Sequence, residues 1–167
     1  IPDQRTFVVI LQACTVLAEN EENILEEEKK AKIVSLEIGQ ALHIDSDRIG
    51  FTHDVFVGNS LISMYGKCGY VHEATNIFNH AKERDIISWN AFISCLIHNV
   101  CCNEALRKFR QMQITKVIPD KVTFLCILDA CAKVTSLIEG QEIHTIVTCV
   151  GLESETVVGT ALVNMYG

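Results

Sequence analysis

The eight cysteines are the residues of this 167-residue chain with the most obvious capacity for chemistry, either as metal ligands or as disulfide partners. Structural zinc sites are commonly built from C-x-x-C pairs, and no such pair occurs here. Cys101 and Cys102 are adjacent, and Cys126 and Cys131 are five residues apart. This spacing favours reduced thiols packed in a protein core, with a metal or disulfide role as the less favoured alternative.

The histidines and acidic residues do not form a catalytic motif. A zinc deaminase needs H-x-E together with a paired cysteine motif, and the pair His72-Glu73 lacks that spacing. Serine nucleophile elbows, phosphate-binding loops and dinucleotide-binding glycine clusters are also absent from the sequence. His43 and His144 recur within one repeated motif, which is typical of structural helix positions. We therefore predict that the chain is not an enzyme, and we expect no cofactor and no metal.

Two stretches of the chain occur twice. The segment DVFVGNSLISMYG (residues 54–66) returns as ETVVGTALVNMYG (155–167), with six identical residues at an offset of 101. The segment PDQRTFVVILQAC (2–14) returns as PDKVTFLCILDAC (119–131), with eight identical residues at an offset of 117. Self-similarity at a fixed offset is typical of stacked-repeat proteins. It predicts that the chain is an array of small structural repeats.

Aligning these segments divides the chain into repeats of unequal length. The predicted repeats are residues 1–54 (aligned from Gln4), 55–85, 86–120 and 121–155, followed by the start of a further repeat at 156–167. The first repeat exceeds its counterpart by 16 residues, and an acidic, helix-prone segment near residues 19–34 accounts for the excess. That segment is either a solvated surface insertion or a misread splice junction in the gene model.

Each complete repeat has the pattern of two helices. In residues 86–120, apolar residues recur at helical spacing in two segments, with Ser88 and Asn103 as the expected N-caps. In the next repeat, helices are expected at about 123–132 and 138–150. No segment alternates with a period of two over the length of a strand. The sequence therefore predicts an all-α stack of helix pairs that bury a continuous core, with Trp89 packed inside it.

Composition and charge narrow the range of functions. Hydrophobic residues make up 49% of the chain, yet no apolar run approaches the roughly 20 residues that a membrane helix needs. The first residues, IPDQRTF, lack the basic and apolar regions of a signal peptide. The net charge of −7 argues against a generic phosphate-binding surface. Because the last repeat stops within its first helix, we expect this sequence to be a fragment of a longer protein.

Taken together, the motifs resemble those of pentatricopeptide repeat proteins of the plant PLS class, in which repeats of three lengths alternate. The motifs are GQALHIDSDRIGF and GQEIHTIVTCVGL, NSLISMYGKCG, ERDIISWNAFIS, EALRKFRQM and VIPD. In this scheme residues 1–54 and 121–155 are L-type repeats, 55–85 is S-type, 86–120 is P-type, and 156–167 opens another S-type repeat. The uniform 34-residue period of tetratricopeptide repeats does not fit these lengths. The resemblance implies a right-handed α-solenoid of helix-turn-helix repeats.

The resemblance also implies sequence-specific binding of single-stranded RNA, one base per repeat. In the family, the fifth and last residues of a repeat form the base-reading pair. These positions hold Asn59 with Asp85 in the S-type repeat and Asn90 with Asp120 in the P-type repeat, and Thr160 opens the next pair. An asparagine amide offers both a donor and an acceptor to a base edge, and an aspartate can orient it. In the family code, asparagine with aspartate favours uracil over cytosine, and threonine favours a purine.

The remaining implied positions have weaker or different roles. The L-type repeats present apolar fifth residues, which cannot hydrogen-bond a base, so these repeats are expected to be spacers or weak readers. Their pairs are Val8 with Asp54 and Leu125 with Glu155. The second residue of a repeat is expected to wedge between bases. These residues are Phe56, Ile87, Val122 and Val157.

By the same resemblance, the expected partners are single-stranded organellar RNA and proteins of an RNA-editing complex, in a mitochondrion or a chloroplast. Recognition of C-to-U editing sites is the favoured role, and neither a membrane nor a small-molecule substrate is expected. Two alternatives stay open: a solenoid that docks protein partners, and a truncated fragment without function. The asparagines and aspartates of the reading pairs also have a purely structural interpretation, as helix starts and turns.

Overall fold

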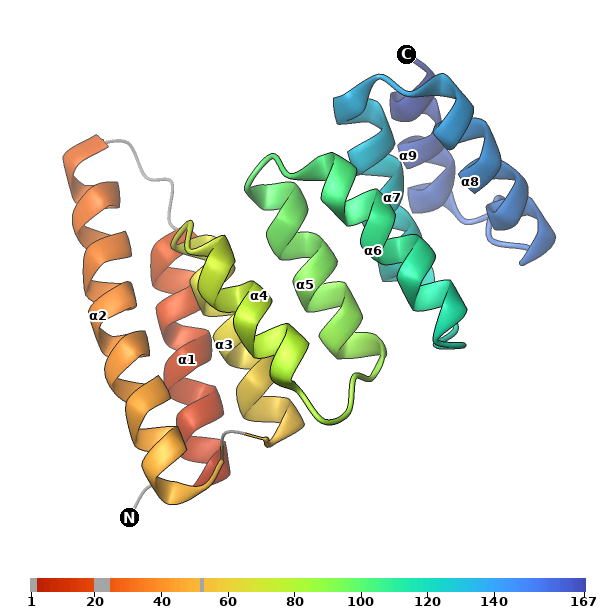
Figure 1. Cartoon of the computed structure of the whole chain (residues 1–167). Coiled ribbons are helices and arrows are strands. Elements are labelled where there is room, and N and C mark those ends of the chain that lie inside the picture. The colour runs from red at the N-terminus through yellow and green to blue at the C-terminus, as the bar shows by residue number, and fades with distance from the viewer. Residues whose placement is uncertain (1–2, 20–24, 52) are drawn as a thin grey trace. The chain divides into compact units, whose positions relative to one another are not determined.

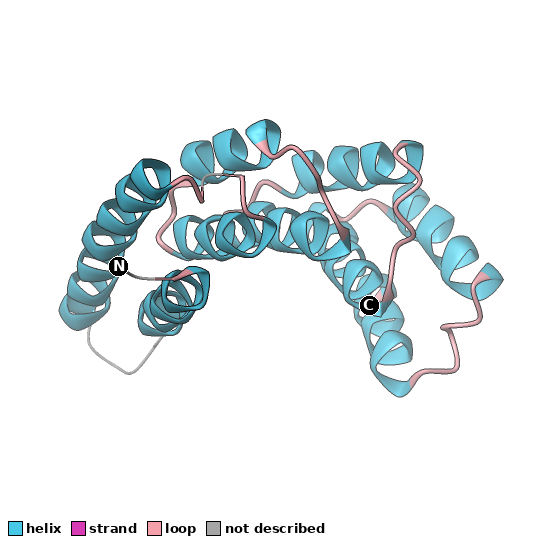
Figure 2. Cartoon of the chain, turned by 90° about the horizontal axis from the view of Figure 1, so that it is seen from below, coloured by secondary structure: helices cyan, strands magenta, loops and turns pink. Residues whose placement is uncertain are grey.

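The computed structural model describes residues 3–19, 25–51 and 53–167, and every regular element in these ranges is an α-helix (Figures 1 and 2). The helices are α1 (Gln4–Glu19), α2 (Leu25–Ile49), α3 (Val55–Lys67), α4 (Val71–His80), α5 (Ile86–His98), α6 (Cys102–Ile114), α7 (Lys121–Val134), α8 (Leu137–Cys149) and α9 (Thr156–Tyr166). The predicted all-α class is confirmed. Within the described ranges, no helix combines the length and apolar character of a membrane span.

The chain divides into two compact bodies, residues 1–95 and residues 96–167. In the N-terminal body, α1 packs against α2 and α3, and α3 packs in turn against α2 and α4 (Figure 1). Phe7 and Leu11 of α1 and Val57 of α3 are fully buried there. First helices of successive repeats therefore contact each other directly, as expected for a stack in which no helix pair can bury its apolar face alone.

An aromatic cluster joins α4 to α5 within the N-terminal body. The ring of Phe78 is stacked on Phe92 with centroids 4.3 Å apart, and it meets Trp89 edge-on at 4.9 Å. Such pairs add about 0.5–1.5 kcal/mol beyond the apolar area that they bury. Trp89 is only 2% exposed, so its predicted position in the core is confirmed.

In the C-terminal body, α7 packs against α6, α8 and α9, and α8 also contacts α9. Phe109 of α6 meets Phe124 of α7 edge-on, with ring centroids 6.1 Å apart. Met112 of α6 and Ile127 of α7 are also fully buried. The body is thus a second set of helix pairs with its own apolar core.

The twice-occurring G-x-x-x-H and M-Y motifs have a physical explanation. Gly39 in α2 leaves room for Met64 of α3, because a Cβ atom at Gly39 would lie 2.2 Å from the Met64 Cε. One turn further along α2, His43 Nδ1 lies 3.1 Å from the Tyr65 hydroxyl. The same pairs recur in the C-terminal body, as Gly140 with Met165 and His144 with Tyr166. Both histidines have the structural role that the sequence predicts.

Two predicted helix starts are wrong. Helix α5 begins at Ile86, before Ser88, because the Asp85 carboxylate accepts from both the backbone N–H and the hydroxyl of Ser88 and so caps the helix earlier. Helix α6 begins at Cys102, one residue before Asn103, and no side chain caps it. The turn after α3 contains Gly69 with a φ of +87°, a backbone conformation that glycine adopts without strain.

The acidic segment near residues 19–34 is described in part. Residues 20–24 lie outside the described ranges. Residues 25–34 form the first part of α2, which is 25 residues long, whereas its counterpart α8 has 13. The later part of the segment therefore extends the second helix of the first repeat.

All eight cysteines are free thiols. Cys14, Cys95, Cys102 and Cys131 are buried, Cys149 is exposed, and the others are half-buried. Burial raises the pKa of Cys131 to about 11, so this thiol is protonated and unreactive at neutral pH. Among the described residues, no group of three or more histidines, cysteines or acids could hold a metal ion.

Candidate nucleic-acid interface

The clearest predicted pair is Asn59 with Asp85. Asn59 lies one turn into α3, and Asp85 directly precedes α5. The Asp85 Oδ1 atom accepts from the Ser88 N–H and the Ser88 hydroxyl, each at 2.8 Å, and from Asn59 Nδ2 at 3.5 Å. The structure thus brings this pair together, with the acid fixed by the helix that follows it and the amide at the outer limit of hydrogen-bond distance.

The Asp85 carboxylate stays ionised below the usual pH range. Partial desolvation raises its pKa, but the hydrogen bonds from Ser88 and Asn59 outweigh that effect and lower the pKa below its ordinary value. A carboxylate in this state only accepts hydrogen bonds, so it holds the NH2 end of the Asn59 amide toward itself. The Asn59 carbonyl and its second N–H are then left for other partners.

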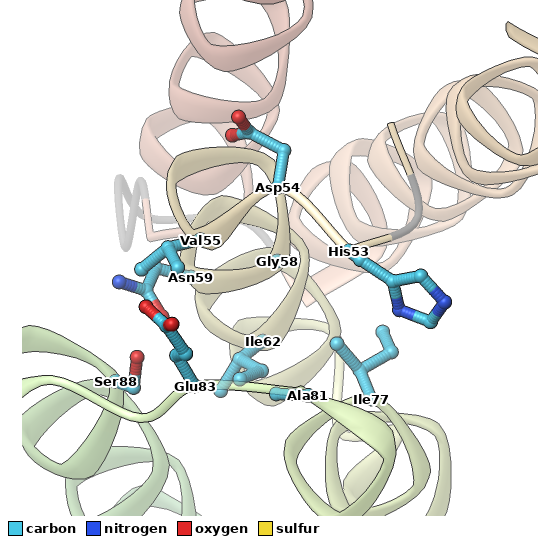
Figure 3. Close-up of a pocket in the computed structure, with 10 residues that line it drawn as sticks. All are labelled: His53, Asp54, Val55, Gly58, Asn59, Ile62, Ile77, Ala81, Glu83 and Ser88. Atoms are coloured by element: carbon cyan, nitrogen blue, oxygen red, sulfur yellow. The ribbon is translucent and has the colours of Figure 1, made fainter. Parts of the chain in front are cut away.

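Beside Asn59 lies a small pocket between α3, the end of α4 and the segment before α5. Figure 3 shows Val55, Asn59 and Ser88 on one side of it and His53 and Ile77 on the other. Its volume of about 20 Å³ is enough for one water molecule, but not for a nucleobase. This pocket therefore does not admit a base to Asn59.

The second predicted pair, Asn90 with Asp120, belongs to two bodies. Asn90 is half-buried in α5, within the N-terminal body. Asp120 is the N-cap of α7 in the C-terminal body, and it forms a reciprocal capping box with Thr123. Asp120 therefore has a capping role equivalent to that of Asp85, which was predicted only as a structural alternative.

The acids that end the predicted repeats 1–54 and 121–155 have a different partner. In the first repeat, Gln4 Nε2 donates to Asp54 Oδ1 at 2.9 Å. In the later repeat, Lys121 Nζ lies 3.0 Å from Glu155 Oε2. Both partners are the first residue of their own repeat. Sequence reasoning missed these contacts, because the fifth residue was the one expected to face the acid.

The predicted fifth residues of these repeats, Val8 and Leu125, are half-buried. Thr160, at the fifth position of the last partial repeat, is exposed, and its hydroxyl donates to the Thr156 carbonyl of its own helix at 2.9 Å. Val8 and Leu125 offer only apolar contact, whereas Thr160 retains acceptor capacity toward a ligand.

The second residues of the four repeats that begin at 55, 86, 121 and 156 are all exposed apolar side chains. The exposed fractions are 60% for Phe56, 55% for Ile87, 50% for Val122 and 54% for Val157. Each is the second residue of a first helix, directly before a buried residue. A regular series of exposed apolar side chains at one repeat position is the kind of surface against which flat apolar rings can stack.

A groove lies beside the second residues of the first two repeats, Arg5 and Phe56, and both residues line it. It is lined by Gln4, Arg5, Val8, Val9 and Phe56 and has a volume of about 450 Å³. That volume lies within the roughly 300–1,000 Å³ of common small-molecule sites. Gln4 and Arg5 were not predicted as site residues. The sequence signal that could have identified Gln4 is a polar first residue combined with an apolar fifth residue in the same repeat.

Within each body, first helices of successive repeats pack together, α1 with α3 and α7 with α9. An acid precedes each first helix at the same repeat position. These features define an α-helical repeat protein. The model of the PPR repeat family matches residues 84–133, and the model of the PPR repeat matches residues 59–86. Residues 59–133 therefore match pentatricopeptide repeats.

Relatives named for these repeats match most or all of the chain. "Pentatricopeptide repeat-containing protein At4g25270, chloroplastic" from Arabidopsis thaliana is 35% identical over 99% of this chain, which spans 28% of that protein. "Pentatricopeptide repeat-containing protein CRR2, chloroplastic", from the same plant, is 34% identical over 99% of this chain, which spans 24% of it. The chain thus spans about a quarter of the length of these relatives. Their names refer to the repeats that they contain and do not mention a reaction.

A solved structure shows the same fold. The pentatricopeptide repeat protein PPR10, crystallised in complex with an 18-nt psaJ RNA element, superposes with a TM-score of 0.71 at 23% identity. The match covers 99% of this chain and 23% of that one. The predicted fold, an all-α repeat solenoid, is therefore confirmed. The division into L-, S- and P-type repeats and the handedness stay predictions.

Proposed function

We propose that the chain binds single-stranded RNA and reads one base with each S- or P-type repeat. The observation that carries the proposal is the Asn59–Asp85 arrangement, in which an acid fixed by the next helix orients an amide on the first helix of its repeat. Such an amide presents one donor and one acceptor in a fixed order to a base edge. The likeness to a repeat protein crystallised with RNA supports this function.

In this proposal Asn59 with Asp85 and Asn90 with Asp120 read bases, with uracil preferred over cytosine. Thr160 begins a third reading pair, which favours a purine. The exposed side chains of Phe56, Ile87, Val122 and Val157 stack between successive bases. Val8 and Leu125 add apolar contact without selecting a base.

The finer biological role follows from the resemblance to the PLS class. We infer that the whole protein recognises C-to-U editing sites in organellar transcripts, together with proteins of an editing complex. Two relatives with chloroplastic in their names favour a plastid over a mitochondrion. The acidic balance of −7 favours a second candidate, a solenoid that docks a protein partner, and the test below separates the two.

The test is a titration of the chain with short RNA oligomers that differ at a single base. We expect binding that weakens with salt, with a log–log slope of about −0.7 per phosphate contacted, and a several-fold preference for uracil over cytosine at one position. Asn59→Ala should remove that preference, whereas Asn103→Ala, on an exposed position of α6, should leave it unchanged. Equal, weak binding of every oligomer by the native chain would contradict base recognition and leave the protein-docking alternative.

A further inference from the structure

The first repeat holds an amide in the same relation to its closing acid as the S-type repeat does, but from a different position. Asp54 Oδ1 accepts from the Phe56 and Val57 N–H groups, each at 3.0 Å, and from Gln4 Nε2 at 2.9 Å. Asp85 Oδ1 likewise accepts two capping bonds, both from Ser88, and a side-chain amide. In both repeats one carboxylate oxygen thus joins the cap of the next helix to an amide of its own repeat.

The two amides lie one helical turn apart on the corresponding first helices of their repeats. Gln4 is the first residue of its repeat, and Asn59 is the fifth of its own, so the positions differ by one helical turn. Residues four apart on a helix are neighbours on one face. The first repeat has Gln4 and Val8 at these positions, and the S-type repeat has Val55 and Asn59. Polar and apolar residues have exchanged places between the first and fifth positions.

The Gln4 side chain also faces a ligand-sized space. It lines the groove of about 450 Å³ together with Arg5, Val8, Val9 and Phe56. The exposed ring of Phe56 and the guanidinium of Arg5 are both flat groups that stack on nucleobases. The groove therefore combines stacking partners with one neutral group that can both donate and accept a hydrogen bond.

We propose that Gln4 is the base-reading residue of the first repeat, which reads from its first position and not from its fifth. The proposal rests on the proposed RNA binding and replaces the spacer role predicted for this repeat. Asp54 only accepts hydrogen bonds, so it fixes the NH2 end of the Gln4 amide and leaves Oε1 and one N–H for the base. Because uracil and cytosine present donor and acceptor in opposite order, a fixed amide distinguishes them.

The later L-type repeat also connects its first residue to its closing acid, but through an ammonium group and not an amide. Lys121 occupies the first position and pairs with Glu155 at 3.0 Å, while Leu125 occupies the fifth. An ammonium group donates and cannot accept, so it cannot distinguish bases by the order of donor and acceptor. Base reading from the first position is therefore assigned to the first repeat alone.

The test uses the full 167-residue chain and four sets of RNA oligomers, each set permuting the base at one position. The position read by Asn59 is located first, as the one whose preference disappears in Asn59→Ala. We then expect a several-fold base preference at one neighbouring position, which disappears in Gln4→Ala and in the similarly sized Gln4→Met. Gln141→Ala, on an exposed position of α8, is the matched control and should change neither preference.

Side-chain amide resonances give a second measurement. In a titration with the preferred oligomer, the NMR signals of the Gln4 NH2 group should shift together with those of Asn59, while those of Gln141 stay in place. RNA binding with a preference at the Asn59 position, together with unchanged preferences in Gln4→Ala and Gln4→Met, would overturn the proposal. Gln4 would then serve only to hold the Asp54 carboxylate in place. If no oligomer shows a preference at any position, the proposed function itself fails, and base reading by Gln4 fails with it.

Discussion

The Tyr65 hydroxyl lies 3.1 Å from His43 Nδ1, and the rings of the two residues meet edge-on with centroids 5.7 Å apart. This contact joins the second helix of the first repeat to the first helix of the next. The equivalent pair, His144 and Tyr166, lies 2.9 Å apart in the C-terminal body. A contact that recurs 101 residues later at the same repeat position is a repeated element of how helix pairs pack in this chain.

Removing the Tyr65 hydroxyl should weaken this junction. We expect Tyr65→Phe to lower the free energy of unfolding by about 1 kcal/mol, because one buried hydrogen bond is lost while the ring packing remains. Chemical denaturation of the variant and the native chain measures the difference. Tyr70→Phe is the control, since that residue is 41% exposed and should change stability little. An equal effect of both variants would contradict a specific role for the His43–Tyr65 contact.

The same tyrosine should make stability depend on alkaline pH. Burial, followed by the nearby charge of Glu73, raises the pKa of Tyr65 to about 12 from an ordinary value of about 10. Because the pKa of Tyr65 is higher in the folded chain than in the unfolded chain, the neutral hydroxyl favours folding. The contribution of Tyr65 to stability is therefore complete below pH 10 and is lost as the pH rises toward 12. Denaturation curves across this range should show a steeper loss for the native chain than for Tyr65→Phe. Parallel curves would contradict the assignment.

Gly39 should not tolerate a side chain. Its Cβ position lies 2.2 Å from Met64 Cε and 2.5 Å from Met64 Sδ, and Met64 is fully buried. We expect Gly39→Ala to cost about 1–3 kcal/mol through overpacking, and its combination with Met64→Ala to cost less than the sum of the two single changes. Gly58→Ala is the matched control, because its Cβ would meet only Ile77 Cγ2 at an ordinary 4.0 Å. In a helix interior that change should be neutral or stabilising.

How far the sequence could predict the molecule depended on the kind of signal. The helix pairs followed from internal repetition and apolar spacing, and the Gly39 and His43 motif was visible because it occurs twice. The start of α5 was misplaced because Asp85 and Ser88 are both good N-cap residues, and a capping box uses one at the cap and another three residues later. Sequence pattern alone does not say which of the two begins the helix.

The missed contact between Gln4 and Asp54 has a different cause. The two residues are 50 positions apart, and their proximity arises only when α1 packs beside the start of α3. Counting from the start of the first repeat places the predicted base-reading position at Val8, an apolar residue. The exchange of polar and apolar residues between positions one and five was visible in the sequence, but only the structure shows that the first-position amide reaches the acid.

The cap formed by Asp85 allows its structural and base-reading roles to be separated. We expect Asp85→Ala to lower stability by about 1 kcal/mol, because the Ser88 N–H loses its acceptor at the start of α5. Asp85→Ser should keep most of the cap, since a serine hydroxyl is also a good N-cap acceptor, yet it should change the base preference because the shorter side chain loses the contact with the Asn59 amide, which is already 3.5 Å from Asp85 Oδ1. Thermal unfolding and RNA titration of both variants measure the two effects. A preference unchanged in Asp85→Ser would leave Asp85 as a cap alone.

Thiol reactivity should report on the packing of the repeats. Cys149 is exposed, whereas burial raises the pKa of Cys131 and of Cys68 to about 11. Because the thiolate is the reactive form, we expect a thiol reagent at pH 8 to modify Cys149 first and to reach Cys68 and Cys131 only as the chain unfolds. Mass spectrometry of peptides after brief labelling gives the order. Early modification of Cys131 in the native chain would contradict the packing of α7.

Arg84 contacts the C-terminal end of α4 through hydrogen bonds to backbone carbonyls and through a cation–π contact. Its Nε donates to the Phe78 carbonyl at 2.7 Å, its Nη2 donates to the Asn79 carbonyl at 2.6 Å, and its guanidinium lies 5.1 Å from the centre of the Phe78 ring. A cation at a helix C-terminus also favours the helix dipole. Because hydrogen bonds to charged groups contribute about 1.5–3 kcal/mol, we expect Arg84→Ala to lower the free energy of unfolding by about 2 kcal/mol. Arg84→Lys should recover only a small part, because an ammonium cannot form the planar fork.

The control for Arg84 is Arg107→Ala, which removes an exposed arginine whose partner is Glu104 in the same helix. An exposed pair of this kind contributes about 0.3–0.5 kcal/mol. Salt should distinguish the two sites further, since the Arg84 contacts are to carbonyls and a ring, whereas the Arg107 contact is between screened charges. We therefore expect the loss in Arg84→Ala to persist at high salt. If it were no larger than that of Arg107→Ala, or disappeared with added salt, Arg84 would be a surface charge and the end of α4 would depend on its apolar contacts alone.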